Sequence, residues 1–274
     1  MLCMINNMVF YRKGKETANT NPKAAPDWEG KGHIFTSMRV KSKKAFFLKE
    51  HINRLLTGID LMASKYKIDY CLQEEIYKGI EKIDDFFPDE YRLKIILTPE
   101  LSMVAKNIEK KYSRHAAVKL LQVPKKEIKN ISSYLKLDDY THSNREIEKA
   151  KKKGHNDVLY LNSVNNIMEC STSNIFFAKQ NQIFTPKLRT GILAGITRKK
   201  LIDCLKRERI IVNCKDISWK ELYEADEIWQ TNAIKGIRPV KMLAQKNFTK
   251  FKRKDSITKK VTDLFNHYCR KNYE

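Results

Sequence analysis

A single glutamate stands inside an otherwise apolar, strand-forming run, IMECSTSNIFF, at residues 167–177. Soon after it, residues 191–198 read GILAGITR, and their glycines break the chain just before a helical pattern begins. A glycine-containing turn that opens a helix exposes backbone N–H groups to which a phosphate can bind. A carboxylate on a strand beside such a turn indicates a charged cofactor that carries a ring. The two segments together therefore support an enzyme hypothesis.

The composition is that of a folded protein of one large domain or two smaller ones, since the chain has 274 residues. Hydrophobic residues make up 42%, and only 9 Gly and 7 Pro occur, so we expect a packed core rather than disorder. No apolar run approaches the roughly 20 residues needed to span a bilayer. The N-terminal MLCMINNM also lacks the basic and long apolar regions of a signal peptide. We therefore expect a cytoplasmic protein without membrane contact.

The cysteine spacing argues against a metal-binding or disulfide-rich protein, and the pattern of charge argues against a nucleic-acid-binding protein. The 6 cysteines are scattered, and no pair has C-x-x-C spacing, so we expect neither a metal site nor a disulfide framework. The formal net charge of +22 is spread along the whole chain. Because the basic stretches lack interleaved aromatic residues that stack on bases, we interpret the charge as a compositional bias and do not expect nucleic-acid binding. Such a surface would still attract anionic substrates.

The first half of the chain mixes predicted strands and helices. Apolar residues recur at helical spacing from Ile52 to Met62, which predicts an amphipathic helix, and Pro88 ends a second one. The expected helices are 50–66 and 72–86. The expected strands are 32–40, 44–48, 91–98 and 116–123, the first two forming a hairpin around a turn at 41–43.

The second half changes to short strands after a polar segment with one proline. That segment, residues 124–132, is the predicted linker between a smaller N-terminal domain, 1–123, and a larger C-terminal domain, 133–274. The expected strands are 157–162, 167–171, 174–178, 182–185, 227–233 and 237–243. The expected helices are 143–153, 196–209 and 256–270.

Eight short motifs occur in order along most of the chain. They are F-x-x-x-R-V at 35–40, H-x-x-R-L at 51–55, a lysine after the linker at 136, E-x-x-x-x-N-[IL]-F at 169–176, T-P at 185–186, G-I-x-x-G-I-T-R at 191–198, A-D-E at 225–227 and T-N-A-x-x-G-I-x-P-V at 231–240. Together they resemble the class IV aminotransferases, the fold-type IV enzymes that use pyridoxal 5′-phosphate (PLP). The resemblance implies a two-domain α/β (α+β) fold like that of D-amino acid aminotransferase, with the cofactor between the domains, and a homodimer.

The resemblance implies roles for three charged residues. Lys136 would form the Schiff base with PLP and then move the substrate proton. Glu169 would pair with the pyridinium nitrogen, because a carboxylate keeps that nitrogen protonated and lets the ring accept electrons. Arg54 would bind the phosphate with its planar donor fork. The ordinary alternatives are a solvated lysine, a glutamate facing water on an edge strand and a solvated arginine on a helix.

Further cofactor contacts are implied for the glycine-containing turn and the last motif. Ile196 and Thr197 would offer N–H groups at a helix N-terminus, and Gly195 would let the phosphate approach closely. Leu193 would pack on the ring or, equally, lie in the plain core, and Asn232 would lie near the phosphate or the edge of the cofactor.

Two polar residues have less defined roles. Asn174 is expected to fix a turn rather than to touch substrate. Tyr140 is considered as a contact to the phenolic oxygen of the cofactor. Asp139 stands where the family often has Asn, which leaves the hydrogen bonding beside Lys136 open.

The resemblance allows two reactions, transamination of branched-chain or D-amino acids and elimination of pyruvate from 4-amino-4-deoxychorismate, which yields p-aminobenzoate for folate synthesis. Thr36 after Phe35, Cys170 after Glu169 and the Asn-Ala pair at 232–233 resemble the lyases more than the transaminases. We therefore predict the lyase, with transamination as the alternative. KGHI at 31–34 replaces the family's Gly-Asp-Gly and makes the substrate the least determined property. A non-catalytic protein that binds through its positive surface is the third hypothesis.

Overall fold

The computed structural model describes residues 2–5, 8–12, 32–62, 70–87, 89–97, 101–108, 118–124 and 133–271. The chain divides into two compact units. The first comprises Met1–Lys110, Tyr134–Tyr140 and Asn272–Glu274, and the second comprises Lys111–Ser133 and Thr141–Lys271. Helices and strands occur in both units, so the predicted mixed α/β class is confirmed.

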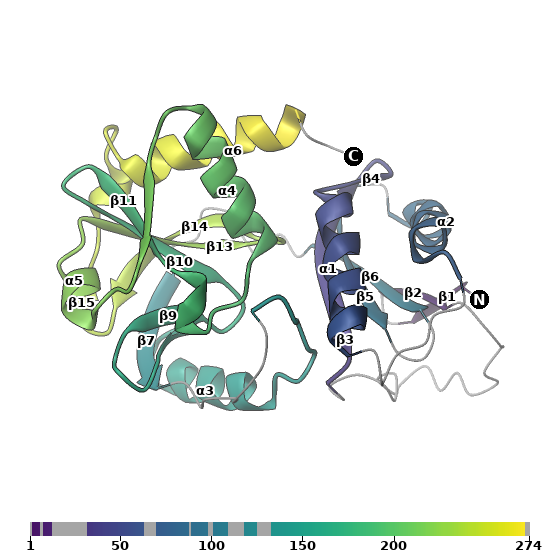
Figure 1. The fold of residues 1–274 in the computed structure, drawn as a ribbon, viewed down its shortest axis with the longest axis horizontal. Coiled ribbons are helices and arrows are strands. Elements are labelled where there is room, and N and C mark those ends of the chain that lie inside the picture. Colours follow the sequence, from purple (N-terminus) through teal and green to yellow (C-terminus); the bar gives the residue numbers. More distant parts are fainter. Residues whose placement is uncertain are drawn as a thin grey trace. The chain divides into compact units, whose positions relative to one another are not determined.

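The first unit is built on a six-stranded antiparallel sheet with the strand order β1-β2-β6-β5-β3-β4 (Figure 1). Its strands are β1 (Leu2–Ile5), β2 (Met8–Arg12), β3 (Ile34–Lys41), β4 (Lys44–Ala45), β5 (Tyr91–Leu97) and β6 (Leu101–Asn107). Helices α1 (Leu48–Leu61) and α2 (Leu72–Asp84) bury their apolar faces in the same core as one face of this sheet. Apolar residues that recur with the 3.6-residue period of a helix or the 2-residue period of a strand lie on the faces that meet in this core.

The other face of the first sheet carries the alternate residues. Ile34 and Met38 lie in the helix-covered core, so Phe35 and Ser37 point to the opposite face. Ser37 pairs directly with Lys94 of β5, which places Lys94 on that same opposite face. This face therefore carries Phe35, Ser37 and Lys94.

The second unit contains a nine-stranded sheet with the order β12-β11-β10-β13-β14-β7-β8-β9, and β15 pairs with β14. Its strands are β7 (Val118–Pro124), β8 (Asp157–Leu161), β9 (Ile167–Cys170), β10 (Asn174–Lys179), β11 (Gln182–Pro186), β12 (Val212–Lys215), β13 (Glu227–Asn232), β14 (Gly236–Leu243) and β15 (Lys246–Asn247). The helices of this unit are α3 (Thr141–Lys152), α4 (Ile196–Arg207), α5 (Trp219–Tyr223) and α6 (Ile257–Lys271), with 3-10 turns η1 (Leu188–Thr190) and η2 (Lys250–Lys252).

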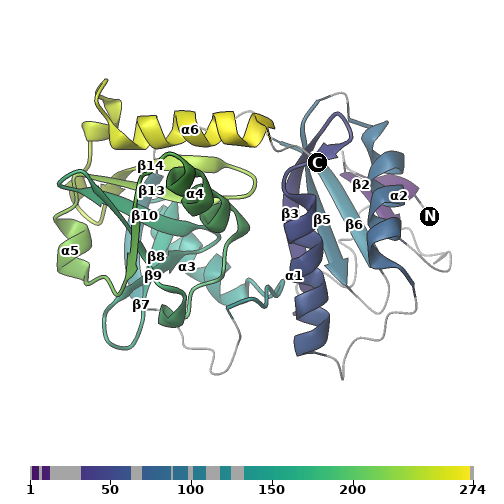
Figure 2. The same cartoon turned by 45° about the horizontal axis from the view of Figure 1, so that its top comes forward.

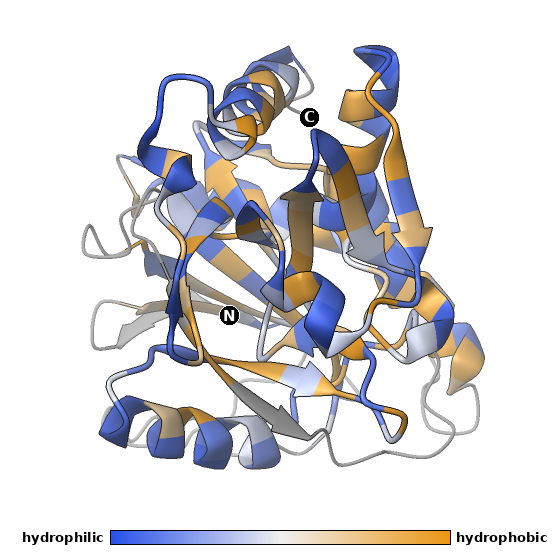
Figure 3. Cartoon of the chain, turned by 90° about the vertical axis from the view of Figure 1, so that its left-hand side faces the viewer, coloured by the Kyte–Doolittle hydropathy of each residue, from blue (hydrophilic) through white to orange (hydrophobic). Residues whose placement is uncertain are grey.

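Helices α4 and α6 contact each other and β13 (Figure 2). Ile196, Leu201 and Leu205 are all buried. In Figure 3 hydrophobic segments recur along the strands, while loops and outer helix faces are mainly hydrophilic. The apolar residues that recur periodically in the sequence therefore lie on the buried faces of the helices and strands of this unit.

Glu227, the acid of the A-D-E motif, is 1% exposed and caps α6. Its carboxylate accepts hydrogen bonds from Ser256 Oγ at 2.7 Å and from the N–H groups of the first turn, at 2.9 Å and 3.0 Å. This motif residue therefore has a structural role at the start of the last helix.

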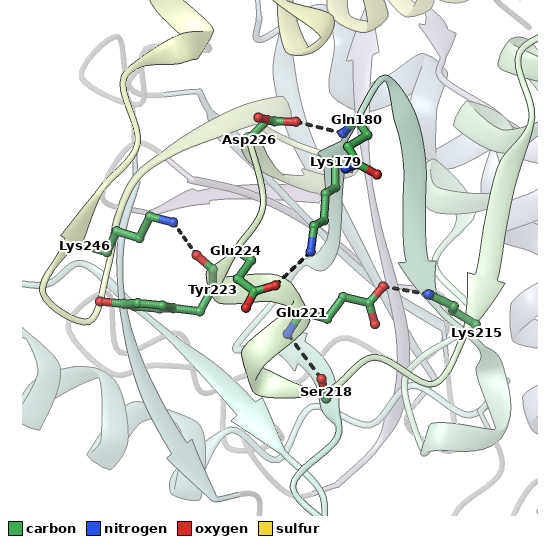
Figure 4. Close-up of polar contacts among 9 residues, drawn as sticks. All are labelled: Lys179, Gln180, Lys215, Ser218, Glu221, Tyr223, Glu224, Asp226 and Lys246. Carbon is green, nitrogen blue, oxygen red and sulfur yellow. Dashed lines mark hydrogen bonds and ion pairs between the residues drawn. The ribbon is translucent and has the colours of Figure 1, made fainter.

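Lysines around α5 form ion pairs with acidic side chains (Figure 4). Lys179 lies 2.9 Å from Glu224, and Lys215 lies 2.6 Å from Glu221. These side chains are partly exposed, and such surface pairs contribute about 0–1 kcal/mol each. Part of the positive charge of the chain is thus neutralised locally here.

The predicted elements agree with the structure except at several short elements. The elements that were not predicted are strands β1, β2, β6, β12 and β15, the short helix α5 and the 3-10 turns η1 and η2. Most of the predicted linker, 125–132, lies outside the described residues. Strand β7 pairs with β8 and β14 of the second unit, and Tyr134–Tyr140 belongs to the first unit, so these units differ from the predicted domains 1–123 and 133–274. No helix in the described ranges is long and apolar enough to cross a membrane.

Candidate active site

Lys136 lies among aromatic side chains of the first unit. Its Nζ donates a hydrogen bond to the Tyr140 hydroxyl at 3.1 Å and lies 4.7 Å from the centre of the Phe35 ring. Phe35 and Tyr140 meet edge to face, with ring centres 5.9 Å apart. The amine is therefore held in a defined place and is only partly exposed, unlike a solvated surface lysine.

Hydrogen bonds to β3 fix the segment that carries Lys136. Phe35 N donates to Lys136 O at 3.0 Å, and Asp138 N donates to His33 O at 3.0 Å. The Asp138 carboxylate also accepts a hydrogen bond from His33 N at 2.7 Å. The segment thus pairs with the strand that carries Phe35, which explains why Tyr134–Tyr140 belongs to the first unit.

The H-x-x-R-L motif places His51 and Arg54 one helical turn apart on α1. His51 is 2% exposed, and its Nδ1 is hydrogen-bonded to Thr36 Oγ1. Burial, together with the positive charges of Arg54 and Lys136, lowers the pKa of His51 well below its ordinary value of 6.5. The imidazole is therefore neutral at neutral pH.

Arg54 is a cation that has been largely removed from water. Burial lowers the pKa of Arg54 to about 10, and the nearby Tyr140 acts in the opposite direction. The guanidinium therefore stays charged at neutral pH. A desolvated cation is stabilised when an anion such as a phosphate binds to it.

Lys94 is a neighbour of Lys136 that the sequence reasoning missed. Its Nζ lies 5.0 Å from the centre of the same Phe35 ring and 3.9 Å from Asp138 Oδ2. Its side chain is only 12% exposed. A charged residue on the apolar strand sequence YRLKIIL was the signal that could have pointed to it.

In the second unit, Glu169 lies on β9 with a hydrogen-bonded carboxylate. Its Oε2 accepts hydrogen bonds from Asn174 Nδ2 at 3.2 Å and from Leu193 N at 3.0 Å. Burial lowers the pKa of Arg198, while Cys214 and, to a smaller extent, the negative charge of Glu169 act in the opposite direction. Although β9 ends the sheet, the carboxylate is thus held by the protein rather than simply facing water.

The first turn of α4 has the features of an anion site. Gly195 is its N-cap residue, and among the described residues no side chain caps this helix and no acidic residue stands in its first turn. Ile196 and Thr197, which follow, are 8% and 7% exposed. The positive end of the helix dipole is therefore available for a negative group.

Thr231 and Asn232 end β13 beside this region. Thr231 pairs with Asn174 across the strands, is 2% exposed, and its Oγ1 has no hydrogen-bond partner among the described residues. Asn232 donates to Thr172 O at 2.8 Å and accepts from Ile234 N at 2.7 Å. The Asn232 side chain therefore builds a turn, whereas the buried Thr231 hydroxyl can still bond to a bound group.

The residues present fit PLP, as each unit shows by itself. The first has an amine, Lys136, and a desolvated cation, Arg54, which suit the aldehyde and the phosphate. The second has the Glu169 carboxylate, an uncapped helix N-terminus and the unpaired Thr231 hydroxyl. Within the described residues no group of three or more His, Cys, Asp and Glu is arranged to hold a metal ion.

Comparison with known proteins agrees with this chemistry. The family model for amino-transferase class IV matches residues 33–243. A Thermotoga maritima protein, named as a probable branched-chain-amino-acid aminotransferase, is 28% identical over 232 residues, 79% of this chain and 79% of that protein. The aminodeoxychorismate lyase of Vibrio harveyi is 33% identical over 109 residues, 38% of this chain and 40% of that protein.

Solved structures are similar in fold. A putative branched-chain amino acid aminotransferase from Thermotoga maritima has a TM-score of 0.80 at 25% identity, covering 96% of this chain and 96% of that chain. The PLP-bound form of a hypothetical aminotransferase from Mycobacterium tuberculosis has a TM-score of 0.73 at 15% identity, covering 86% of this chain and 88% of that chain. These similarities confirm the predicted fold-type IV class.

Proposed function

The chain belongs to the class IV aminotransferases, which are PLP-dependent enzymes, and we propose that it is a lyase that releases pyruvate from 4-amino-4-deoxychorismate. The observation that carries the proposal is the pair of lysines beside the Phe35 ring. This substrate has a cyclohexadiene ring and two carboxylates. An aromatic ring with a second, poorly exposed cation, Lys94, suits it better than it suits a branched aliphatic side chain.

PLP, when bound, withdraws electrons from the amino-bearing carbon of the substrate. Lys136 removes the proton from that carbon, and the C–O bond to the enolpyruvyl group then breaks. The leaving group takes up a proton and becomes pyruvate, while the ring becomes aromatic as p-aminobenzoate. Tyr140 holds the Lys136 amine in place, and Arg54 and the first turn of α4 bind the phosphate.

The cofactor-binding set is the one given by the resemblance: Arg54, Lys136, Glu169, Leu193, Gly195, Ile196, Thr197 and Asn232. For Asn232 we propose a contact through its backbone, because its side chain is engaged in the turn. We also propose a homodimer, which light scattering of the purified protein tests.

The decisive experiment incubates the PLP-loaded protein with 4-amino-4-deoxychorismate and no keto acid. Pyruvate is followed with lactate dehydrogenase and NADH, and p-aminobenzoate by chromatography. We expect the two products in equal amounts. Pyruvate that forms only when a keto acid acceptor is added, or not at all, contradicts the lyase.

A branched-chain transaminase is the second candidate, because the Thermotoga maritima relative with that name matches a larger share of this chain than the lyase of Vibrio harveyi does. Its test is a half-reaction without keto acid. Leucine, glutamate and D-alanine are each added to the PLP-loaded protein, and the visible absorbance of the bound cofactor is recorded. A transaminase loses this absorbance on amino-group transfer, whereas the lyase keeps it with all three amino acids.

A further inference from the structure

Asn174 connects the Glu169 carboxylate to the turn before α4. It is the first residue of β10 and is 5% exposed. Its Nδ2 donates hydrogen bonds to Glu169 Oε2 at 3.2 Å and to Leu193 O at 3.0 Å. Leu193 N donates to the same Glu169 oxygen at 3.0 Å. Glu169, Asn174 and Leu193 thus form a closed hydrogen-bonded group within the second unit.

Gly195 is matched to this arrangement. A Cβ at position 195 would lie 1.9 Å from Asn174 Oδ1, far closer than real Cβ contacts. The backbone of Gly195, with φ −62° and ψ 129°, is one that any L-residue adopts, so its conformation does not require glycine. Turning the Asn174 amide away would break its two hydrogen bonds. Position 195 therefore requires glycine because of the Asn174 oxygen, in addition to the expected close approach of a phosphate.

We propose that Asn174 is a positioning residue for PLP and that Asn174 and Gly195 form a matched pair. The pair fixes the Glu169 carboxylate relative to the N-terminus of α4. Because the ring nitrogen and the phosphate of PLP are a fixed distance apart, the two protein groups that receive them must also be fixed. The inference rests on the proposed role of Glu169, and it holds for a lyase and for a transaminase alike.

The first experiment compares PLP binding by the wild-type protein, Asn174→Ala and Asn174→Asp. Asn174→Ala is expected to raise the Kd for PLP about tenfold or more, as loss of one hydrogen bond to a charged group predicts. Asn174→Asp keeps the shape but places a carboxylate against Glu169, so the two share a proton. We expect the visible absorbance of its bound PLP to change with pH over a range in which the wild-type absorbance is constant.

The control is Asn213→Ala. Asn213 Nδ2 donates to Ile183 O at 3.3 Å in the same unit and has no recorded contact with Glu169. This variant should keep the wild-type Kd and absorbance. If both Asn174 variants also keep them, the positioning role is overturned.

The second experiment measures the thermal unfolding of the protein without PLP. Gly195→Ala alone should lower the Tm by about 3 °C or more, because the new methyl group collides with Asn174. In the Asn174→Ala background the same substitution should change the Tm by less than about 1 °C, because the colliding oxygen is gone. An equal loss in both backgrounds overturns the matched pair.

The outcomes separate this inference from the proposed function. If the wild-type protein binds PLP but releases no pyruvate, the lyase proposal is contradicted, and both experiments on Asn174 can still test the positioning role. If the wild-type protein releases pyruvate but the Asn174 variants have the same Kd and absorbance as the wild type, the lyase proposal stands and the positioning role is overturned. A wild-type protein that binds no PLP contradicts both the proposed function and the positioning role.

Discussion

The residues around Lys136 and the residues around Glu169 hold their charges in different ways. In the first unit the cations Lys136, Lys94 and Arg54 are all poorly exposed, and burial lowers the pKa of Arg54 to about 10. In the second unit Glu169 accepts hydrogen bonds from Asn174 and from a backbone N–H. The first group contains a desolvated cation, Arg54, that a bound anion would stabilise. The other is satisfied by hydrogen bonds and mainly sets geometry.

This difference predicts two kinds of failure. Substitution of one of these cations should change the affinity of the protein for anionic groups. The effect should be smaller at high salt wherever solvent reaches the cation, because salt screens exposed charges. Substitution of Glu169 itself should change the electronic state of the cofactor while PLP stays bound, whereas substitution of Asn174 should also weaken PLP binding.

Lys136→Ala should have the largest effect. Loss of the amine removes both the covalent bond to PLP and the proton carrier, so we expect turnover to fall by at least about a thousandfold. The circular dichroism spectrum should not change. Borohydride reduction followed by mass spectrometry should label Lys136 with PLP in the wild-type protein only. The control Lys151→Ala, at an exposed position on α3, should retain both activity and labelling.

Glu169→Gln tests the second unit. We expect turnover to fall by about a hundredfold or more, since a neutral amide no longer stabilises a protonated ring nitrogen. PLP should remain bound, as judged by absorbance after gel filtration. Full turnover of this variant would contradict the assignment of Glu169, and Glu221→Gln on α5 serves as the surface control.

Arg54→Ala tests the phosphate contact of the first unit. It removes a charge-assisted contact worth about 1.5–3 kcal/mol, so the Kd for PLP should rise about 10- to 100-fold. Arg54→Lys should recover only part of this, because an ammonium lacks the planar fork. Kd is measured by fluorescence titration, and an unchanged value for Arg54→Ala would remove the residue from the site.

Lys94→Met tests the substrate carboxylate contact. The side chain keeps its length but loses its charge, so KM for 4-amino-4-deoxychorismate should rise about tenfold while kcat changes less than about threefold. Steady-state kinetics with varied substrate separate the two constants. Lys106→Met, at an exposed position on β6, is the matched control. A loss in kcat without a change in KM would contradict a binding role.

The smallest effect is a pH dependence of stability caused by His51. Its pKa is lowered on folding, so below the ordinary value of 6.5 the unfolded chain takes up a proton that the folded chain does not. The free energy of unfolding should therefore fall as the pH drops from 6.5 towards the lower folded-state pKa, by up to about 1.4 kcal/mol per pH unit. Thermal unfolding of His51→Gln across this range should lack that component. His267→Gln, at an exposed position on α6, should keep it.

Most helices and strands were predictable because their patterns are local. The period of apolar residues located α1, α4 and α6, and turn residues such as Gln180 and Asn181, which have positive φ, located the hairpin of β10 and β11. Strand β6 was missed because LSMVAKN alternates weakly, although four of its seven residues are fully or nearly buried. Its burial comes from β2 and β5, which are its neighbours in the sheet.

The candidate site was predictable to the extent that it depends on motifs. Lys136 and Glu169 do occupy protected, hydrogen-bonded positions. Lys94 was missed because its neighbour Phe35 lies on another strand. Asn174 was expected to fix a turn, and its amide bonds both to Leu193, in the turn before α4, and to Glu169, a partner that the sequence did not indicate.

The sequence by itself determined the fold class and the family and supplied the candidate residues for PLP binding, because these depend on local periodicity and on motif order. Only the tertiary structure decided which residues lie close enough to interact electrostatically or to form a hydrogen bond. It put Lys94 beside the ring that Lys136 contacts, and it put the Asn174 oxygen where a side chain at position 195 would begin. The physical reason is that hydrogen bonding and packing act between residues close in space, and strand register brings together residues that are far apart in the sequence.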